Sequence, residues 1–416
     1  MYKNYKLIFK LAWLNVWRRK ARAVLVVLMI GVSMSVMLGI QGLYDGMTNH
    51  MIDNTLRSDS GEVSIYAPSH RLHKSLKYHL KDTAGIIQKL SHIEQIKATA
   101  QRIKVTGLVS TARKSSMAKL IGIDIVQEKE FGDFEDFIIE GQKEWSSTQW
   151  SRQKNYALIG KKLAKTMKVS VGGRVVFSSQ NIEGDLSSIS LRIKGIVQTT
   201  NPAIDDMALF VSLAKGQEFT GLQTDDSTQI ALRIDPKANL TKIKETITAL
   251  LPDEDIYTWL ELYPALEQMQ EMMKVFNGIS FFIVMLVVLI GIMGVMLVSI
   301  LERLREFGIL LAIGEPYKNM RLQVVVEALI LGIGGYLIGA ILGGAVLYYM
   351  KTYGLDLSAF SDGLEEFGMA STIYATIKSS YFSTTLIAII IAALLSVILP
   401  IRRLKKLNPI EVIQGD

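Results

Sequence analysis

The sequence predicts an α-helical membrane protein with four transmembrane helices and a large extracytoplasmic α+β domain between the first and second of them. Three observations predict this fold class. Apolar residues make up 49% of the 416 residues, and the mean hydropathy is positive, at +0.27. Four long apolar runs lie along the chain. Strand and helix patterns alternate in the polar segment that separates the first two runs.

The four apolar runs are the predicted transmembrane helices. Each has about 20 residues or more, enough to cross about 30 Å of hydrocarbon as a helix. Buried helices of a soluble protein are the alternative for all four, but a soluble fold does not need four such runs. A cleaved signal peptide is the alternative for the first run, although no small-x-small cleavage site follows it. The runs cover residues 23–43, 276–300, 322–350 and 382–401.

The positions of Lys and Arg predict the orientation, because basic residues concentrate on the cytoplasmic side of a membrane protein. Residues 1–22 carry seven basic residues and no acid, the tail 402–416 opens with a basic cluster, and the connection 301–321 carries four basic residues. The loop 351–381 carries two basic and four acidic residues. Both termini are therefore expected in the cytoplasm, and residues 44–275 and the loop on the far side. The formal charge of +7 then marks topology, and we expect no nucleic-acid partner.

Residues 1–22 form a predicted amphipathic helix that lies on the inner membrane surface. Leucines recur at helical spacing, and Trp13 and Trp17 lie one turn apart beside Lys and Arg residues. Trp beside basic residues suits the headgroup layer of a bilayer. The alternative is a plain cytoplasmic start to the first span.

The segment 44–275 is the predicted α+β domain, and we expect it to have two lobes. Residues 258–275 are expected to form a helical stalk that leads into the second span. The strand signals are short and bounded by turn residues, and helical patterns lie between them. The predicted strands lie at 61–68, 118–125, 172–179, 190–197 and 228–234, and the predicted helices at 83–93, 159–167 and 240–251.

The sequence contains no recognisable enzyme site. It has no G-x-x-x-x-G-K-[ST] phosphate loop and no G-x-S-x-G nucleophile elbow, so we predict that the chain is not an enzyme and itself binds no cofactor. Without cysteine it forms neither disulfides nor thiolate metal sites. All five histidines fall within residues 50–92, and His70 and His73 raise the question of a metal site. We favour surface histidines, because this segment is polar.

A glycine face marks the third apolar run. Gly335, Gly339 and Gly343 are spaced by four, so they share one side of a helix and permit another helix to approach closely. We expect a packing seam, either within the chain or between two chains. The alternative is that glycine is simply common in membrane helices.

Glu327 is the single charged residue within the four runs. Ionisable residues in a membrane span are functional candidates by default. Glu327 lies near the predicted cytoplasmic end of its span. It is expected either to form an ion pair with Arg303 or Arg321 or to take part in a conformational change.

Together these features resemble the membrane subunits of ABC transporters of the MacB, LolC/LolE and FtsX superfamily. The layout is similar: one span, a large extracytoplasmic domain, then three spans. The ending LPIRRLKKLNPIEVIQGD and the entry to the first span, LAWLNVWRRKARAVL, are also similar. ALIGKKLAKTMKVSVGGRVVF, followed by LRIKGIVQT and DMALFVSL, resembles part of a MacB-like periplasmic core domain. The layout is closest to the lipoprotein-releasing LolC/LolE type, because MacB carries its ATPase on the same chain.

The resemblance implies a role for ERLREFGILLAIG, residues 302–314. In this family the short cytoplasmic helix after the second span is a coupling helix, which docks on a separate ATPase subunit. We expect one helix with an apolar anchor (Phe307, Leu310 and Leu311), charges that orient it, and a glycine that ends it. The residues expected to couple to the ATPase are Glu302, Arg303, Arg305, Glu306, Phe307, Gly308, Leu310, Leu311 and Gly314.

The resemblance also implies the function. The chain is expected in the bacterial inner membrane, where it would couple ATP hydrolysis to extracytoplasmic conformational change (mechanotransmission) and release lipoproteins or other amphiphilic cargo. ATP and Mg would bind the partner ATPase dimer. Further expected partners are a second permease copy, identical or homologous, membrane lipid, and a periplasmic carrier or adaptor. The alternatives are MacB-like tripartite export of peptides or drugs, and FtsX-like regulation of an extracytoplasmic cell-wall hydrolase.

Overall fold

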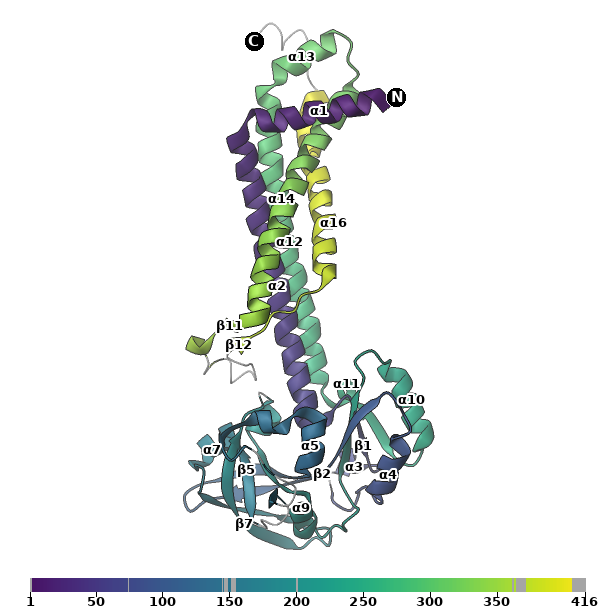
Figure 1. Ribbon diagram of the computed structural model, residues 1–416, viewed down its shortest axis with the longest axis vertical. Helices are drawn as coiled ribbons and strands as arrows, with labels where there is room; N and C mark the ends of the chain where they lie inside the picture. Colours follow the sequence, from purple (N-terminus) through teal and green to yellow (C-terminus); the bar gives the residue numbers. More distant parts are fainter. Residues whose placement is uncertain are drawn as a thin grey trace. The chain divides into compact units, whose positions relative to one another are not determined.

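The structure is a computed structural model, and the chain in it forms two compact units (Figure 1). The helical unit contains residues 1–48, 270–358 and 372–416, and the sheet unit contains residues 49–269 and 359–371. The predicted tail 402–416 lies outside the described residues after 405, as does part of the loop 351–381. The structure describes residues 2–73, 75–143, 145, 149–150, 155–199, 201–360, 363 and 372–405.

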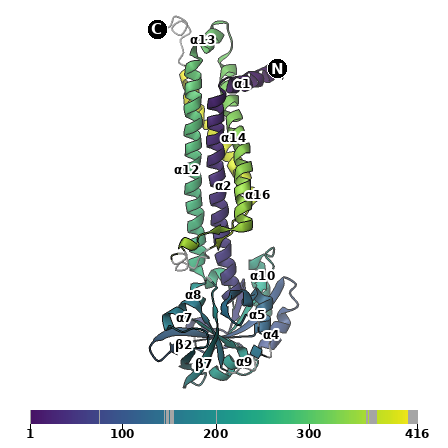
Figure 2. The same cartoon turned by 60° about the vertical axis from the view of Figure 1, so that its left-hand side comes forward.

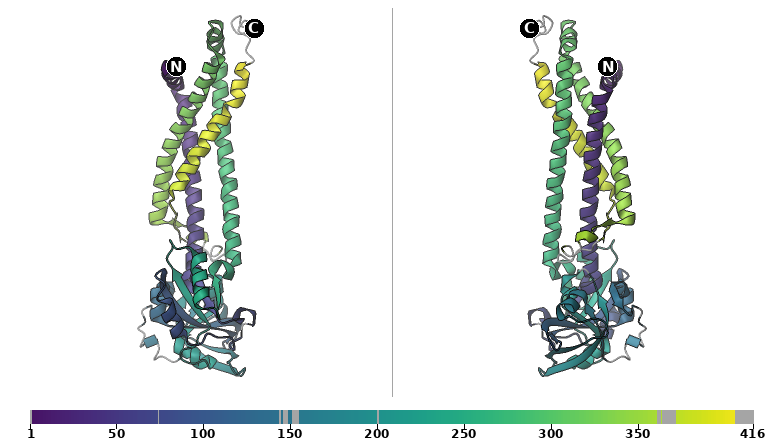
Figure 3. Two further views of the ribbon diagram at one scale, coloured as in Figure 1. Left: turned by 90° about the vertical axis from the view of Figure 1, so that its right-hand side faces the viewer. Right: turned by 90° about the vertical axis from the view of Figure 1, so that its left-hand side faces the viewer.

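Four helices of the helical unit are long and apolar enough to cross a membrane. They are α2, α12, α14 and α16, which lie side by side in this unit (Figures 2 and 3). The prediction of four spans, with the large domain between the first and second, is confirmed. The helices of the unit are α1 (Tyr2–Arg18), α2 (Lys20–Thr55), α12 (Pro264–Glu302), α13 (Leu304–Ala312), α14 (Tyr317–Tyr353), α16 (Ser379–Ser396) and α17 (Ile398–Lys405).

The long helices continue past the apolar runs because the flanking polar residues also form helix well. A proline marks the start of one of these helices, and a glycine marks the end of another. Pro264 occupies the first position of α12, where its missing N–H costs nothing. Gly354, at a φ of +73°, ends α14. Between these ends, apolar side chains of the four helices form one core, which includes Ile30, Ile292 and Ala392.

The sheet unit is built on one ten-stranded sheet. Its order is β10-β1-β9-β2-β3-β8-β5-β7-β4, and β6 pairs with both β2 and β7. β3 runs parallel to β8 and β5 parallel to β7, while the other pairs are antiparallel. The strands are β1 (Val63–Tyr66), β2 (Ile96–Ser110), β3 (Ser115–Ile123), β4 (Ile138–Gly141), β5 (Tyr156–Gly160), β6 (Arg174–Gln180), β7 (Leu186–Val197), β8 (Ala208–Ser212), β9 (Gln229–Ile234) and β10 (Asp255–Thr258).

Helices cover this sheet, and side-chain caps define several of them. Asn239 accepts hydrogen bonds from two backbone amides at the start of α10, and Asp124 and Ser212 cap α5 and α9 in the same way. The predicted helices at 83–93, 159–167 and 240–251 correspond to α4, α7 and α10. The helices are α3 (His70–His73), α4 (Thr83–Leu90), α5 (Ile125–Gly132), α7 (Lys161–Met167), α8 (Pro202–Asp205), α9 (Leu213–Thr220), α10 (Leu240–Leu250) and α11 (Trp259–Leu262).

The apolar core of the sheet unit consists of separate clusters, and the prediction of two lobes stays a prediction. One cluster joins β1 and β9 to α4 and α10, and includes Ile65, Leu90 and Ile247. Others lie on the part of the sheet formed by β2, β3, β5, β6, β7 and β8, and include Phe177 and Phe210. The sheet is continuous across these clusters because the fifteen-residue strand β2 pairs with β3 along one edge, and with β9 and then β6 along the other.

The histidines show one difference from the prediction. The side chain of His79 is only 8% exposed, and its Nε2 lies 3.2 Å from the Asp226 carboxylate. His70 stacks on the ring of Tyr66. Among the residues that the structure describes, no group of three or more His, Asp or Glu side chains is placed to hold a metal ion.

Candidate functional site

The predicted coupling segment, residues 302–314, is two helices and not one. α12 ends at Glu302, and α13 begins at Leu304. Arg303, at φ −112° and ψ 15°, breaks the helical path between them. α13 ends where Gly314 adopts a φ of +91°, and Pro316 precedes α14.

Arg303 turns its guanidinium toward the buried carboxylate of Glu327. Arg303 Nη1 lies 2.9 Å from Glu327 Oε1, and the same oxygen accepts from Asn15 Nδ2 at 3.0 Å and from Gln323 Nε2 at 3.2 Å. Glu327 is only 3% exposed, so the ion pair is shielded from solvent. Of the two arginines considered from the sequence, Arg303 is the partner. This contact joins α1, α14 and the junction between α12 and α13.

The two acids of the segment, Glu302 and Glu306, bind arginines near the N-terminus. Glu302 accepts two hydrogen bonds from Arg22, at 2.7 and 2.8 Å, and also pairs with Arg19. Arg18 Nη1 lies 2.7 Å from Glu306 Oε1, and this hydrogen bond lowers the pKa of Glu306 below its usual value. Most charges of the segment are thus engaged within the chain.

These side chains surround a polar cavity of about 130 Å³. Its wall combines basic groups of α1 and α2 with acidic groups of α12, α13 and α14. The pair between Arg303 and buried Glu327 is screened less than a surface pair, whereas Arg18 and Glu306, 66% and 45% exposed, form a surface pair that adds little stability. The cluster therefore links α13 to α1 and to the neighbouring ends of α2, α12 and α14.

The apolar side of α13 differs from the prediction. Phe307 is fully buried, Gly308 is buried, and Leu310 and Leu311 pack against the core of the spans. Phe307 therefore does not form a surface anchor as expected. The physical reason is that its ring lies under the Arg303 guanidinium, 5.0 Å from it, on the side of α13 that faces the spans. The outward apolar side chains are Ile309, 49% exposed, and Ile313, 74% exposed.

The glycine face of α14 packs against α2 of the same chain. A Cβ atom at any of the three glycines would lie 2.5 to 2.7 Å from an atom of α2, closer than real contacts allow. Glycine is therefore required for this approach of the two helices. Gly335 lies against Ile30, Gly339 against Met34, and Gly343 against Leu38.

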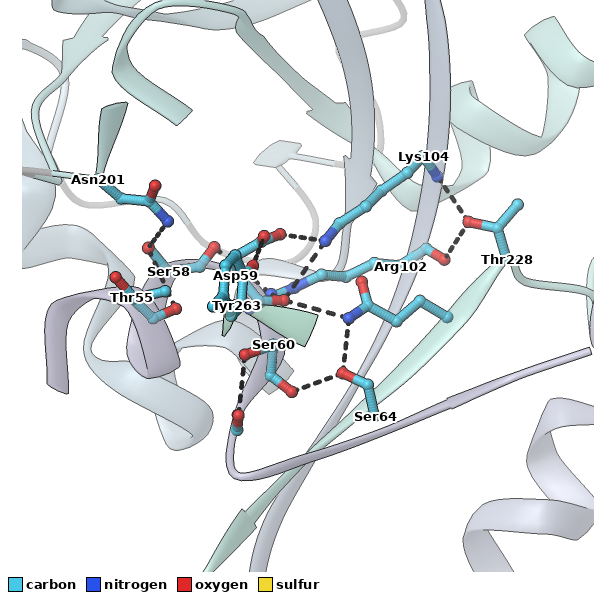
Figure 4. A network of polar contacts seen from close by, with 12 residues as sticks. Thr55, Ser58, Asp59, Ser60, Ser64, Arg102, Lys104, Asn201, Thr228 and Tyr263 are labelled. Carbon is cyan, nitrogen blue, oxygen red and sulfur yellow. Dashed lines mark hydrogen bonds and ion pairs between the residues drawn. The ribbon is translucent and has the colours of Figure 1, made fainter. Parts of the chain in front are cut away.

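A second polar cluster lies in the sheet unit, around the single π-helical turn Leu56–Ser60 that follows α2 (Figure 4). The Asp59 carboxylate pairs with Lys104 Nζ and accepts a hydrogen bond from the Tyr263 hydroxyl. Asp59 lies in the turn that follows α2, and Tyr263 directly precedes α12. One carboxylate thus holds the two points where the chain enters and leaves the sheet unit.

Arg102 holds the backbone of the same turn. Its Nη1 donates to the backbone oxygens of Ser58 and Asp59. Its Nε and Nη2 bind the Glu128 carboxylate at 2.5 and 2.6 Å, and both side chains are almost fully buried. A buried pair of this kind fixes geometry more than it adds stability, because desolvation offsets most of the attraction.

The neighbours of Asp59 keep its carboxylate charged. Burial alone would raise the pKa of Asp59, but attraction to Lys104 and the hydrogen bonds from Lys104 and Tyr263 hold that pKa well below its usual range. Burial lowers the pKa of Lys104. Burial also raises the pKa of the Tyr263 phenol, which therefore stays a proton donor at neutral pH.

Sequence reasoning missed this cluster, although one signal was available. Arg102 and Lys104 are two residues apart among apolar neighbours in AQRIKV, so on a strand they share one face. Two cations on one face of a buried strand require acidic partners. The identity of Asp59 and Glu128 as those partners depends on the long-range pairing of the sheet.

Comparisons with known proteins agree with this architecture. A family model described as the MacB-like periplasmic core domain matches residues 23–250, and one described as the FtsX-like permease C-terminal region matches residues 278–409. No curated protein sequence matches the chain.

Several solved structures resemble part of the chain. The periplasmic region of MacB from Actinobacillus actinomycetemcomitans is 18% identical, with a TM-score of 0.35, over 49% of this chain and 92% of that one. The extracellular domain of the noncanonic ABC-type transporter YknZ from Gram-positive bacteria is 15% identical, with a TM-score of 0.33, over 46% and 92%. A domain of a putative permease from Porphyromonas gingivalis is 13% identical, with a TM-score of 0.29, over 47% and 85%.

These structural scores are low, so the assignment rests on the two family models. The first of them alone spans more than half of the chain, and the second spans the last three membrane helices. Together they account for the large domain, the spans and their order. The chain therefore belongs to the MacB/FtsX superfamily of ABC transporter permeases.

Proposed function

We propose that this chain transmits movement from an ABC ATPase partner in the cytoplasm to its own extracytoplasmic domain, in the bacterial inner membrane. Permeases of this superfamily work with ABC ATPase partners. The observation that carries the proposal is the charge cluster around Glu327. It connects α13 to α1 and α14, so a displacement of α13 moves several helices together.

The outward face of α13 is the docking surface in this proposal. Ile309 and Ile313 expose apolar area, and Arg305 lies on the same helix with its side chain exposed. An apolar centre with a charge at its edge is the usual composition of a protein interface. Glu302, Arg303 and Glu306 then act inside the chain, because they hold α13 on the spans.

The interior of the spans supports transmission of movement rather than conduction of a polar solute. The described core of α2, α12, α14 and α16 is formed by residues such as Met34, Val288, Leu331 and Ile389. A path for a polar solute needs polar or charged lining. We therefore propose that the cargo is handled on the far side of the membrane. A lipoprotein or another lipid-anchored, amphiphilic molecule is the leading cargo, handled by two permease copies above two ATPases.

The docking surface is tested with Ile309→Asp in the complete complex. We expect loss of ATPase co-purification and of ATP-driven release, because a carboxylate replaces apolar contact area. Ile377→Asp is the matched control, since Ile377 is also exposed but lies in the predicted far-side loop. Gly308 is buried, so a bulky residue there tests packing and not docking. Retained ATPase binding in Ile309→Asp would overturn the docking surface.

The cargo is tested by mass spectrometry of the intact complex from native membranes. An ATPase together with a lipoprotein supports the proposal. An ATPase with an adaptor and a channel, or with a cell-wall hydrolase, contradicts lipoprotein release and favours export or regulation. Absence of any ATPase contradicts the coupling mechanism itself.

A further inference from the structure

An apolar cavity of about 250 Å³ lies beneath α1, between α2 and α14. Its wall is almost wholly apolar, so it offers few hydrogen-bond partners to water. The lining includes Trp13 and Trp17 of α1, Val24 and Leu28 of α2, and Gly334 of α14. The charge cluster described above does not use this cavity.

The cavity opens toward the outside of the helical unit. Four of its lining side chains remain well exposed: Trp13 at 47%, Trp17 at 42%, Val24 at 43% and Leu28 at 48%. In a membrane protein this outside is lipid at the level of the spans. The occupant must therefore reach the cavity from the bilayer and must be apolar where it enters.

Two basic residues lie one helical turn away from residues that line the cavity. Lys20 is one helical turn before Val24, so it shares the face of α2 that lines the cavity. Lys10 is one turn before Trp13 on α1. Both lysines are exposed, and neither has an ion pair among the residues that the structure describes. By contrast, Arg18, Arg19 and Arg22 are paired with acids.

We propose that this cavity binds one acyl chain of an anionic phospholipid of the cytoplasmic leaflet, and that Lys10 and Lys20 bind its phosphate. The tryptophans mark the level of the headgroups. Long basic side chains reach toward that level while their stems cover apolar surface. The site holds α1 against the bilayer. It needs only the membrane location of the helices and depends neither on the cargo nor on the ATPase.

The test uses quenching of tryptophan fluorescence in the full chain, reconstituted in phosphatidylcholine vesicles. One series contains phosphatidylglycerol brominated on its acyl chains, and the other contains equally brominated phosphatidylcholine at the same fraction. Two tryptophans line the cavity, and Trp145, Trp150 and Trp259 lie in the sheet unit. The doubly substituted W13F/W17F chain therefore gives the background.

We expect stronger quenching by phosphatidylglycerol, with a preference of about fivefold for each lysine near the surface. The double variant K10Q/K20Q should lose this preference and keep the quenching by phosphatidylcholine. Equal quenching by the two lipids in the parent chain would overturn the anionic site.

Two cavity-filling variants test the acyl chain itself. In Gly334→Leu the first added atom meets only Val27 at 3.5 Å, an ordinary contact, so the new side chain extends into the cavity. Quenching by both lipids should fall. Gly294→Leu is the matched control, because an added Cβ there meets nothing within 4 Å and Gly294 does not line the cavity.

If Gly334→Leu does not accumulate, Val24→Phe fills the same cavity from α2, where Val24 is 43% exposed. Quenching that stays at the parent level in these variants would overturn the proposal. In that case the cavity is covered by something other than lipid, such as a second chain.

Discussion

The hydrogen bond between Tyr263 and Asp59 offers the sharpest test of how the sheet unit holds its chain ends. Tyr263→Phe removes only the hydroxyl that donates to the buried carboxylate. A hydrogen bond to a charged group contributes about 1.5 to 3 kcal/mol. Because Tyr263 lies at the junction of α11 and α12, we expect this loss to appear as local opening rather than global unfolding.

Hydrogen exchange of the full chain in detergent measures this opening. The amide of Tyr263 donates to the Trp259 carbonyl at 2.8 Å, and the amide of Trp259 donates to the Glu62 carbonyl at 3.0 Å. Since about 1.4 kcal/mol corresponds to a factor of ten, both amides should exchange roughly 10 to 150 times faster in Tyr263→Phe. Amides in the middle of β2 should be unchanged.

Tyr257→Phe is the matched control. Its hydroxyl lies 3.5 Å from the nearest Asp255 oxygen, at the limit of a hydrogen bond, so its removal should leave exchange near the parent rate. Unchanged exchange in Tyr263→Phe would refute the inference that Asp59 holds the start of α12. Asp59→Asn should have a larger effect, up to about 3 to 5 kcal/mol, because it leaves the partly buried Lys104 without its anion. Folding lowers the pKa of Asp59. The contribution of Asp59 to the stability of the fold is therefore present above the ordinary aspartate pKa, and it is lost as the pH falls from that value toward the lower pKa of the folded state.

Three further predictions concern other parts of the chain. Gly339→Leu should destabilise the spans by about 1 to 3 kcal/mol, because its Cβ would lie 2.7 Å from Met34. Gly294→Leu, the control, should leave the stability of the spans unchanged. Equal melting temperatures of Gly339→Leu and Gly294→Leu would contradict the packing seam. Glu327→Gln should destabilise the helical unit by about 3 to 5 kcal/mol, because it leaves Arg303 without its buried anion. Thermal unfolding in detergent measures this loss. A variant as stable as the parent chain would contradict the ion pair. Burial, together with the charges of the neighbouring aspartates, raises the pKa of Glu254 to about 7. The contribution of Glu254 to the stability of the fold is therefore present below the ordinary glutamate pKa and is lost as the pH rises through 7. Glu254→Gln should therefore slow local hydrogen exchange, relative to the parent, at pH 8 and much less at pH 5, and a gain that is equal at both values would contradict the shift.

The spans were predictable because their signal is local. Long apolar runs have one stable outcome in a bilayer, and glycines spaced by four share a face in any helix. The strands that sequence patterns identified were those with clear turn boundaries. The long strand β2 was missed because its polar and apolar residues do not alternate regularly. The place of β2 inside the sheet depends on its pairing with β3, β6 and β9, which are distant in the sequence or pair along only part of its length.

The buried face of α13 was not predictable from the same reasoning. The helix carries two apolar sets, Phe307 with Leu310 and Leu311, and Ile309 with Ile313. Helical spacing alone does not say which set faces the spans. That choice depends on distant contacts, such as the hydrogen bond between Asn15 and Glu327, which are 312 residues apart. A pattern of local residues cannot contain this information.

The pairing of N-terminal arginines with late acids has a consequence for synthesis. Residues 1–22 leave the ribosome long before Glu302 and Glu306 exist, so their positive charges are unpaired while the first span enters the membrane. In the proposed orientation, these unpaired charges help to retain the N-terminus in the cytoplasm during that time. Once the chain passes residue 306, three of these charges are neutralised by acids. The same arginines can thus direct insertion first and lock the finished helices later, and the helical unit cannot close before most of the protein has been made.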